Sequence, residues 1–148
     1  MLAELFISNI AIIKNECICP SASLTVLTGE TGAGKSIIID SVGLIMGERA
    51  YKELLRTGEE KATVSALFRD IGQEAAETAK ALGIETEDGT LLLQRDITDK
   101  GGSIARINGR TVPLAIMREI AEKLISIHGQ HATKILLSEE NYLSFLDA

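Results

Sequence analysis

The sequence predicts an α/β domain in which a mixed sheet with antiparallel hairpins packs on a buried helix. Three observations lead to this prediction. A glycine-rich segment lies between an apolar, β-prone run and a helical run, within residues 24–46. Later segments alternate apolar and polar residues with strand period, and turn sequences such as Asn108-Gly109 join them. The 148 residues are 45% apolar but only 3% aromatic, so the chain can bury one aliphatic core.

The first elements surround the glycine-rich segment. Residues 2–7 are expected to form a strand, and residues 10–13 either continue it or begin a second one. The polar stretch 15–23 is expected to include a turn between strands. Residues 24–28 should form the strand that leads into the glycine-rich segment. The helix expected at 35–46 is apolar on nearly every side, which is typical of a helix buried between layers.

Hairpins and short helices follow. Asn108-Gly109 strongly favours a two-residue hairpin, Gly83 suits the end of a helix, and Pro113 suits the start of one. The expected elements are a charged loop at 47–61 with a helical turn at 51–55, strands at 62–68, 90–97, 103–107, 110–112 and 124–127, helices at 73–82 and 114–124, and a last helix from Ser138.

Composition excludes some classes of function. A net charge of −6 argues against a generally basic nucleic-acid-binding surface, although it allows a local basic patch. Met1 is followed by Leu-Ala-Glu-Leu, so we expect no signal peptide. No apolar run approaches the roughly 20 residues of a membrane helix. We therefore expect a cytoplasmic protein without a membrane anchor.

The cysteines and histidines do not by themselves predict a metal site. Cys17 and Cys19 are separated by one residue, which places them on the same side of a strand. Residues so close rarely form a disulfide, and no second ligand pair for zinc is present, so ordinary reduced residues are expected. His128 and His131 are three residues apart, but no third ligand is evident.

The most specific motif is the glycine-rich segment, which fits the phosphate-binding P-loop pattern G-x-x-x-x-G-K-[ST]. Its glycines allow backbone N–H groups to point at phosphate oxygens, and the following helix N-terminus adds partial positive charge. Lys35 would contact the β- and γ-phosphates, and the Ser36 hydroxyl would ligate Mg²⁺. The predicted nucleotide-binding residues are Gly29, Glu30, Thr31, Gly32, Ala33, Gly34, Lys35, Ser36 and Ile37.

The P-loop alone predicts phosphate binding and leaves the reaction open. The chain has no N-K-x-D motif for guanine, and Asp99–Gly102, which fits D-x-x-G, is better explained as a hairpin turn. No apolar strand ends in the acidic pair that would hold Mg²⁺ and activate water. A small-molecule P-loop kinase, with its acceptor bound between Lys61 and Arg110, is therefore an alternative to an ATPase, and a nucleotide-gated interaction module is a third possibility.

Four stretches together resemble one family. The chain is similar to RecN, the bacterial DNA-repair relatives of the structural-maintenance-of-chromosomes (SMC) ATPases, from Met1 to about Leu137. The P-loop occurs in many families, but the combination and order of the stretches are much more specific. The stretches are residues 28–40, 56–62 (Arg-Thr-Gly-Glu-Glu-Lys-Ala), 106–110 (Arg-Ile-Asn-Gly-Arg) and 127–131 (Ile-His-Gly-Gln-His).

The resemblance implies a split ATPase head. In that family the N-terminal lobe carries the P-loop and a glutamine loop, a coiled coil follows, and the C-terminal lobe brings the signature motif and the acidic pair. Residues 1–148 are then expected to be the N-terminal lobe, which explains the missing acidic pair. The expected function is ATP binding with Mg²⁺ in repair of DNA double-strand breaks by recombination. Two heads would form a homodimer around ATP, and the protein would be cytoplasmic and associated with the nucleoid.

The resemblance also implies roles for two residues outside the P-loop. Gln130 matches the glutamine that contacts Mg²⁺ and the attacking water in related heads, so it is a candidate catalytic and metal-binding residue beside Lys35. Arg56 lies where SMC heads place an arginine near the nucleotide or bound DNA. Without the resemblance, Gln130 would be a surface residue after a strand and Arg56 a solvated loop charge.

Overall fold

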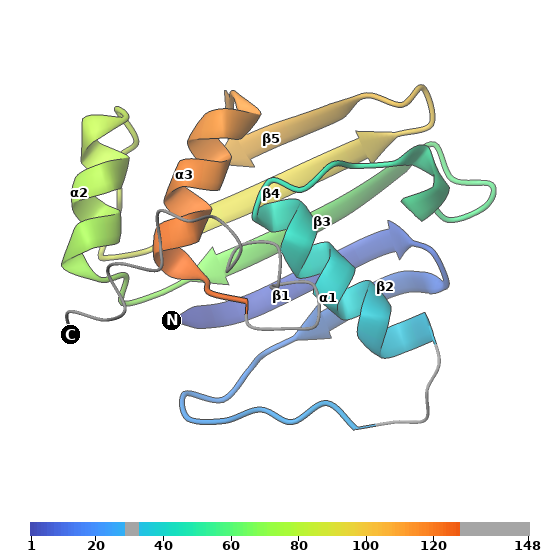
Figure 1. Ribbon diagram of the computed structural model, residues 1–148, viewed down its shortest axis with the longest axis horizontal. Coiled ribbons are helices and arrows are strands. Elements are labelled where there is room, and N and C mark those ends of the chain that lie inside the picture. The colour runs from blue at the N-terminus through green and yellow to red at the C-terminus, as the bar shows by residue number, and fades with distance from the viewer. Residues whose placement is uncertain (29–32, 128–148) are drawn as a thin grey trace, which may run out of the picture.

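A computed structural model describes residues 1–28 and 33–127 of the chain. These residues form two layers, a six-stranded sheet and three helices that lie on the same face of it (Figure 1). The strands are β1 (Leu2–Ile10), β2 (Ile13–Ile18), β3 (Lys61–Phe68), β4 (Leu91–Thr98), β5 (Ser103–Ile107) and β6 (Arg110–Val112). The helices are α1 (Ala33–Ile45), α2 (Gln73–Ala81) and α3 (Leu114–Leu124), and a 3₁₀ turn, η1, spans Lys52–Leu54.

The sheet is built from hairpins. Its strand order is β2-β1-β3-β4-β5-β6, and each neighbouring pair is antiparallel. The β5–β6 turn has positive φ at both Asn108 (48°) and Gly109 (78°). This is the backbone that a two-residue hairpin of the Asn-Gly type requires. The α/β class and the antiparallel hairpins packed on the P-loop helix are confirmed.

Strand alternation separates a covered face from an open face of the sheet. In β3, Ala62, Val64, Ala66 and Phe68 are each 1% exposed, while the residues between them are only half-buried. Burial of each larger aliphatic or aromatic side chain contributes about 1.5–3 kcal/mol. The helices cover this face with buried residues that include Ile37, Leu44 and Ile45 of α1 and Met117 and Ile120 of α3.

Helix α1 is buried on one side. It begins two residues before the predicted start, at Ala33, and ends at Ile45. Ile37 is 6% exposed against the sheet, but Ile39, about 200° further round the helix, is 53% exposed. The prediction of burial on nearly every side is therefore wrong for the residues that the structure describes, because only the sheet-facing side of α1 has a layer packed against it.

Three predicted segments differ from the structure. Residues 13–18 form the edge strand β2, so the first part of the stretch 15–23, which was expected to include a turn between strands, is itself a strand. An edge strand pairs on one side only and tolerates polar residues. Residues 24–28 are not a strand, and Leu24 and Val26 are 76% and 68% exposed. Residues 125–127 are not a strand either. Strands need backbone partners, and within 1–28 and 33–127 no strand pairs with these two segments.

The strand predicted at 2–7 continues to Ile10, and the strand expected at 10–13 is wrong, because residues 11 and 12 form the turn between β1 and β2. The remaining predicted elements are confirmed within one or two residues, including the helical turn at η1. The helix predicted from Ser138 lies outside the described residues. In the described part of the chain, no helix is long and apolar enough to cross a membrane.

Candidate nucleotide-binding site

The second half of the P-loop motif forms the first turn of α1. The helix begins at Ala33, so Gly34, Lys35 and Ser36 lie at its N-terminal end, and Gly29–Gly32 lie outside the described residues. Ser36 is exposed and Lys35 is half-buried. N–H groups in the first turn of a helix have no intrahelical acceptor, and this end carries partial positive charge. The first turn of α1 contains no acidic residue that would neutralise it.

Gly34 leaves open space in front of this turn. Among the residues that the structure describes, a Cβ atom built on Gly34 would have no other heavy atom within 4 Å, apart from its chain neighbours and the backbone of its own helix. The space is thus free for a ligand that approaches the backbone closely, as a phosphate group does in a P-loop. Ile37 also belongs to the predicted site, but its side chain is buried in the core, so only its backbone is available to a ligand.

The opposite end of α1 is held by two arginines. Arg95 of β4 is 2% exposed and donates from Nη1 to the carbonyl oxygen of Leu44 at 3.5 Å. Arg118 of α3 donates from Nη2 to the carbonyl oxygen of Gly47 at 2.7 Å. Positive side chains at a helix C-terminus are stabilising. These contacts fix the helix with its negative end in the core and its positive end at the phosphate loop.

Arg95 is a buried charge whose hydrogen bonds go to neutral groups. Its Nε and Nη2 atoms donate to Oγ of Ser103 at 3.2 and 2.8 Å. Burial, and then the nearby charge of Arg118, lower the pKa of Arg95 from its usual value. The sequence does not single out this residue, because Gln94-Arg95-Asp96 interrupts an apolar strand without showing which side chain faces the helices.

Asp96 has the most extensive polar contacts in the described residues, on the open face of the sheet. Its side chain is 2% exposed, pairs with Lys61 at 3.0 Å, and also pairs with Arg106. It accepts further hydrogen bonds from Thr63 at 2.9 Å and from Gln94 at 3.0 Å. Burial alone would raise the pKa of Asp96, but these hydrogen bonds outweigh it and hold the pKa below its usual value. The partners come from three neighbouring strands, so Asp96 is a structural carboxylate of the sheet.

Arg56 makes contacts with the turn between β1 and β2. Its Nη1 atom donates to the carbonyl oxygen of Ile12 at 2.6 Å and lies 3.5 Å from that of Ala11. Its backbone N–H donates to the carbonyl oxygen of Asn9 at 2.9 Å. The half-buried Arg56 therefore has a structural role in joining the loop around η1 to this turn. Gln130 lies outside the described residues.

Three surface hollows are present in the described part of the chain. Their volumes are about 610, 540 and 280 Å³. The first two are lined by α2 and by residues 83–92 and 107–110, and the third lies beside Arg95 and Ser103. None of the three is lined by a residue of α1. A kinase acceptor would have to bind next to the phosphate loop, so these hollows do not support the kinase alternative.

Comparison with protein families matches residues 4–146 to the AAA domain family. Among curated proteins, the chain is 50% identical over 148 residues to the DNA repair protein RecN of Halalkalibacterium halodurans and 45% identical to RecN of Bacillus subtilis. Each alignment covers 99% of this chain but 26% of the relative. The chain thus spans about a quarter of the length of the curated relatives that it matches.

Solved structures share the fold at low sequence identity. An SMC head domain of Pyrococcus furiosus with an extended coiled coil, bound to the C-terminal domain of ScpA, superposes with a TM-score of 0.72 at 20% identity, over 99% of this chain and 41% of that one. A chain from work on ATP-driven dimerization and DNA-stimulated activation of SMC ATPases gives a TM-score of 0.69 at 18% identity, over 99% of this chain and 97% of that one. The fold is that of an SMC-type ATPase head.

Proposed function

We propose that this chain, which belongs to the AAA domain family and matches RecN proteins along its length, binds ATP at the N-terminus of α1. The observation that carries the proposal is the position of Gly34-Lys35-Ser36 in the first turn of a helix whose far end is fixed by Arg95 and Arg118. Backbone N–H groups and the helix dipole would stabilise the phosphate oxygens.

The chemistry of the first turn fits an Mg²⁺–nucleotide complex. Ser36 is exposed, so its hydroxyl is available as an oxygen ligand for Mg²⁺, which prefers such ligands. Lys35 is half-buried near the start of the helix, and its ammonium group would neutralise charge on the β- and γ-phosphates. An Mg²⁺ ion held by the Ser36 hydroxyl would supply positive charge to the phosphates of the bound nucleotide.

The fold and the relatives support a larger assembly. We infer that residues 1–148 form the N-terminal lobe of a split head in an SMC-like ATPase for DNA repair and recombination. ATP would be sandwiched between two heads of a homodimer, and hydrolysis would separate them. Gln130 would then orient water and Mg²⁺, and Arg56 would contact DNA or nucleotide in addition to the β1–β2 turn. The protein would act in the cytoplasm on the nucleoid.

Lys35→Ala tests the binding site directly. Loss of one charge-assisted contact costs about 1.5–3 kcal/mol, so affinity for Mg²⁺–ATP, measured by titration calorimetry, should fall roughly 10- to 150-fold. The exposed Lys80→Ala on α2 is the matched control and should bind as the unchanged chain does. Equal affinity in Lys35→Ala and Lys80→Ala would contradict the proposal.

The rate of ATP hydrolysis by the isolated chain distinguishes an ATPase lobe from a small-molecule kinase. We expect this chain alone to bind ATP without steady hydrolysis, since the acidic pair and the opposing signature motif belong to other parts of a split head. Steady hydrolysis by the pure chain that is lost in Lys35→Ala would place the catalytic base within these residues and favour the kinase.

A further inference from the structure

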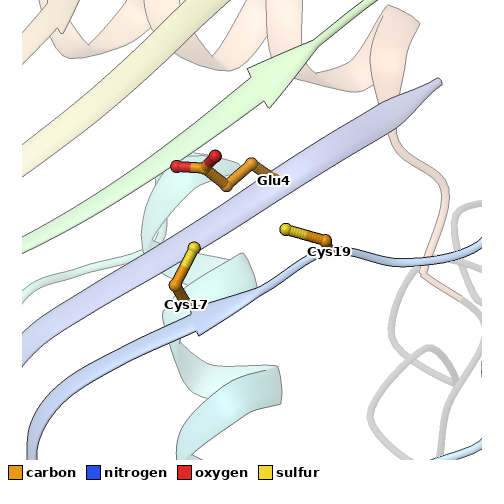
Figure 2. Close-up of side chains that lie close together, drawn as sticks. All are labelled: Glu4, Cys17 and Cys19. Carbon is orange, nitrogen blue, oxygen red and sulfur yellow. The ribbon is translucent and has the colours of Figure 1, made fainter.

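The sheet brings a carboxylate beside the two cysteines. Leu5 of β1 pairs with Ile18 of β2 on the covered face, and Phe6 pairs with Cys17, so Cys17 lies on the open face. Glu4 and Cys19, one position before Leu5 and one after Ile18, share that open face. Figure 2 shows the Glu4 side chain on β1 close to Cys17 of β2 and to Cys19 just after β2.

The three ligand atoms are close enough for one metal ion. A carboxylate oxygen of Glu4 and the Sγ atoms of Cys17 and Cys19 lie within 4.8 Å of one another. In a tetrahedral zinc site, Zn–S distances of about 2.3 Å and Zn–O distances of about 2.1 Å place neighbouring ligand atoms about 3.6–3.8 Å apart. All three residues are exposed, so their side chains have room to rotate toward a shared ion.

The donor set favours a soft divalent cation. Thiolates select zinc and similar ions over Mg²⁺ and Ca²⁺, which prefer oxygen ligands only. Both thiols are free, and no lysine or arginine of the described residues forms an ion pair with Glu4. A bound cation would compensate the negative charge that two thiolates and a carboxylate bring together.

We propose that Glu4, Cys17 and Cys19 bind one thiophilic divalent cation of the Zn²⁺ class, with water as the fourth ligand. Binding would release the protons of the thiols that it deprotonates. The ion would join the end of β2 to β1, and so hold the start of the segment that leads to the phosphate loop at 29–36. Sequence analysis could not find the third ligand, because Glu4 and Cys17 are neighbours only through strand pairing.

Metal titration of the reduced chain tests the site. After removal of metal, the 148-residue chain should take up about one Zn²⁺, measured by competition with a chromophoric chelator. Co²⁺ in its place should show a thiolate-to-cobalt charge-transfer band and the visible bands of a tetrahedral site. Both measurements are made without nucleotide, so their outcome does not depend on whether the proposed ATP site is correct.

Single substitutions should reveal each ligand. Loss of an outer-shell partner costs 10- to 100-fold in affinity, so loss of a ligand in Cys17→Ser or Cys19→Ser should cost at least about 100-fold. The charge-transfer band of bound Co²⁺ should weaken in each single variant, because one thiolate remains, and disappear in the double variant. Glu4→Gln should weaken binding by about 10-fold or more and keep the band. The control is Glu16→Gln, on the same strand but pointing to the opposite side from Cys17, and it should bind within about twofold of the unchanged chain.

Two results would overturn the proposal. One is Zn²⁺ binding that persists in the Cys17→Ser/Cys19→Ser double variant, and the other is a Co²⁺ complex of the unchanged chain without a charge-transfer band. The substituted side chains are exposed, so circular dichroism should show the same fold in all variants. Loss of binding with the fold retained would confirm that these side chains are the ligands.

Discussion

Replacing Gly34 with alanine should raise the stability of the free chain and lower its affinity for nucleotide. Gly34 lies in the first turn of α1, and in the described part of the chain an added Cβ would have no other heavy atom within 4 Å beyond its chain neighbours and its own helix backbone. Alanine loses less conformational entropy than glycine when a helix forms, a difference of about 0.5–1 kcal/mol. The free chain should therefore become slightly more stable, with the melting temperature raised by about 1–4 °C.

The affinity of the same variant for Mg²⁺–ATP should fall. The space in front of Gly34 is where the proposed phosphate group approaches the backbone, so the new methyl group would collide with it. Overpacking of this kind costs about 1–3 kcal/mol. The dissociation constant for Mg²⁺–ATP should rise roughly 5- to 150-fold.

Thermal melts followed by circular dichroism and titration calorimetry measure the two effects separately. Gly72→Ala is the matched control, because a Cβ on Gly72 also meets no heavy atom within 4 Å and the residue precedes α2 rather than α1. Its nucleotide affinity should not change. If Gly34→Ala keeps its fold and binds Mg²⁺–ATP as tightly as Gly72→Ala, phosphate does not approach the first turn of α1 as proposed.

Three further predictions concern residues outside the P-loop motif. In Asp96→Asn, urea unfolding at pH 7 should show a loss of about 1–3 kcal/mol in stability, the value of charged hydrogen bonds. Because the native pKa of Asp96 is below its ordinary 3.8, the wild-type advantage is present above about pH 4 and should shrink as pH falls through the native pKa. In a longer protein that carries both lobes, Gln130→Ala should lower ATP hydrolysis while nucleotide affinity stays within a few-fold, since an uncharged water-orienting group acts mainly in the transition state; an equal loss of affinity would contradict this role. In that protein, Arg56→Ala should weaken DNA binding and reduce the slope of its salt dependence by about one, whereas the exposed Lys52→Ala should not. If ATP affinity falls instead, Arg56 belongs to the nucleotide site.

Features that depend on local sequence could be predicted without the structure. Asn108-Gly109 specifies its turn because few other residue pairs tolerate two positive φ angles. Alternation in residues 62–68 identifies both the strand and its covered face. The Gly-Lys-Ser end of the P-loop predicts a helix start, and α1 begins within two residues of the predicted position.

Other features are decided by which segments meet in space. Residues 24–28 have strand-like composition but form no strand, because β-structure needs hydrogen-bonding neighbours as well as suitable side chains. Asp96 and Arg95 are adjacent in sequence and lie on opposite faces of β4, where one is stabilised by neighbouring strands and the other faces the C-terminus of α1. The sequence of β4 alone does not predict which residues contact Asp96 or which contact Arg95.

By itself, the sequence therefore determined the hairpins from β4 to β6, the helix boundaries to within about two residues and the phosphate-binding motif, since each depends on backbone preferences over a few residues. Only the tertiary structure decided that Glu4 lies beside Cys17 and Cys19, that Arg56 reaches the carbonyl oxygen of Ile12, and that two arginines hold the far end of α1. Those contacts join residues between 13 and 71 positions apart, and chain pairing and packing, not local preference, bring such residues together.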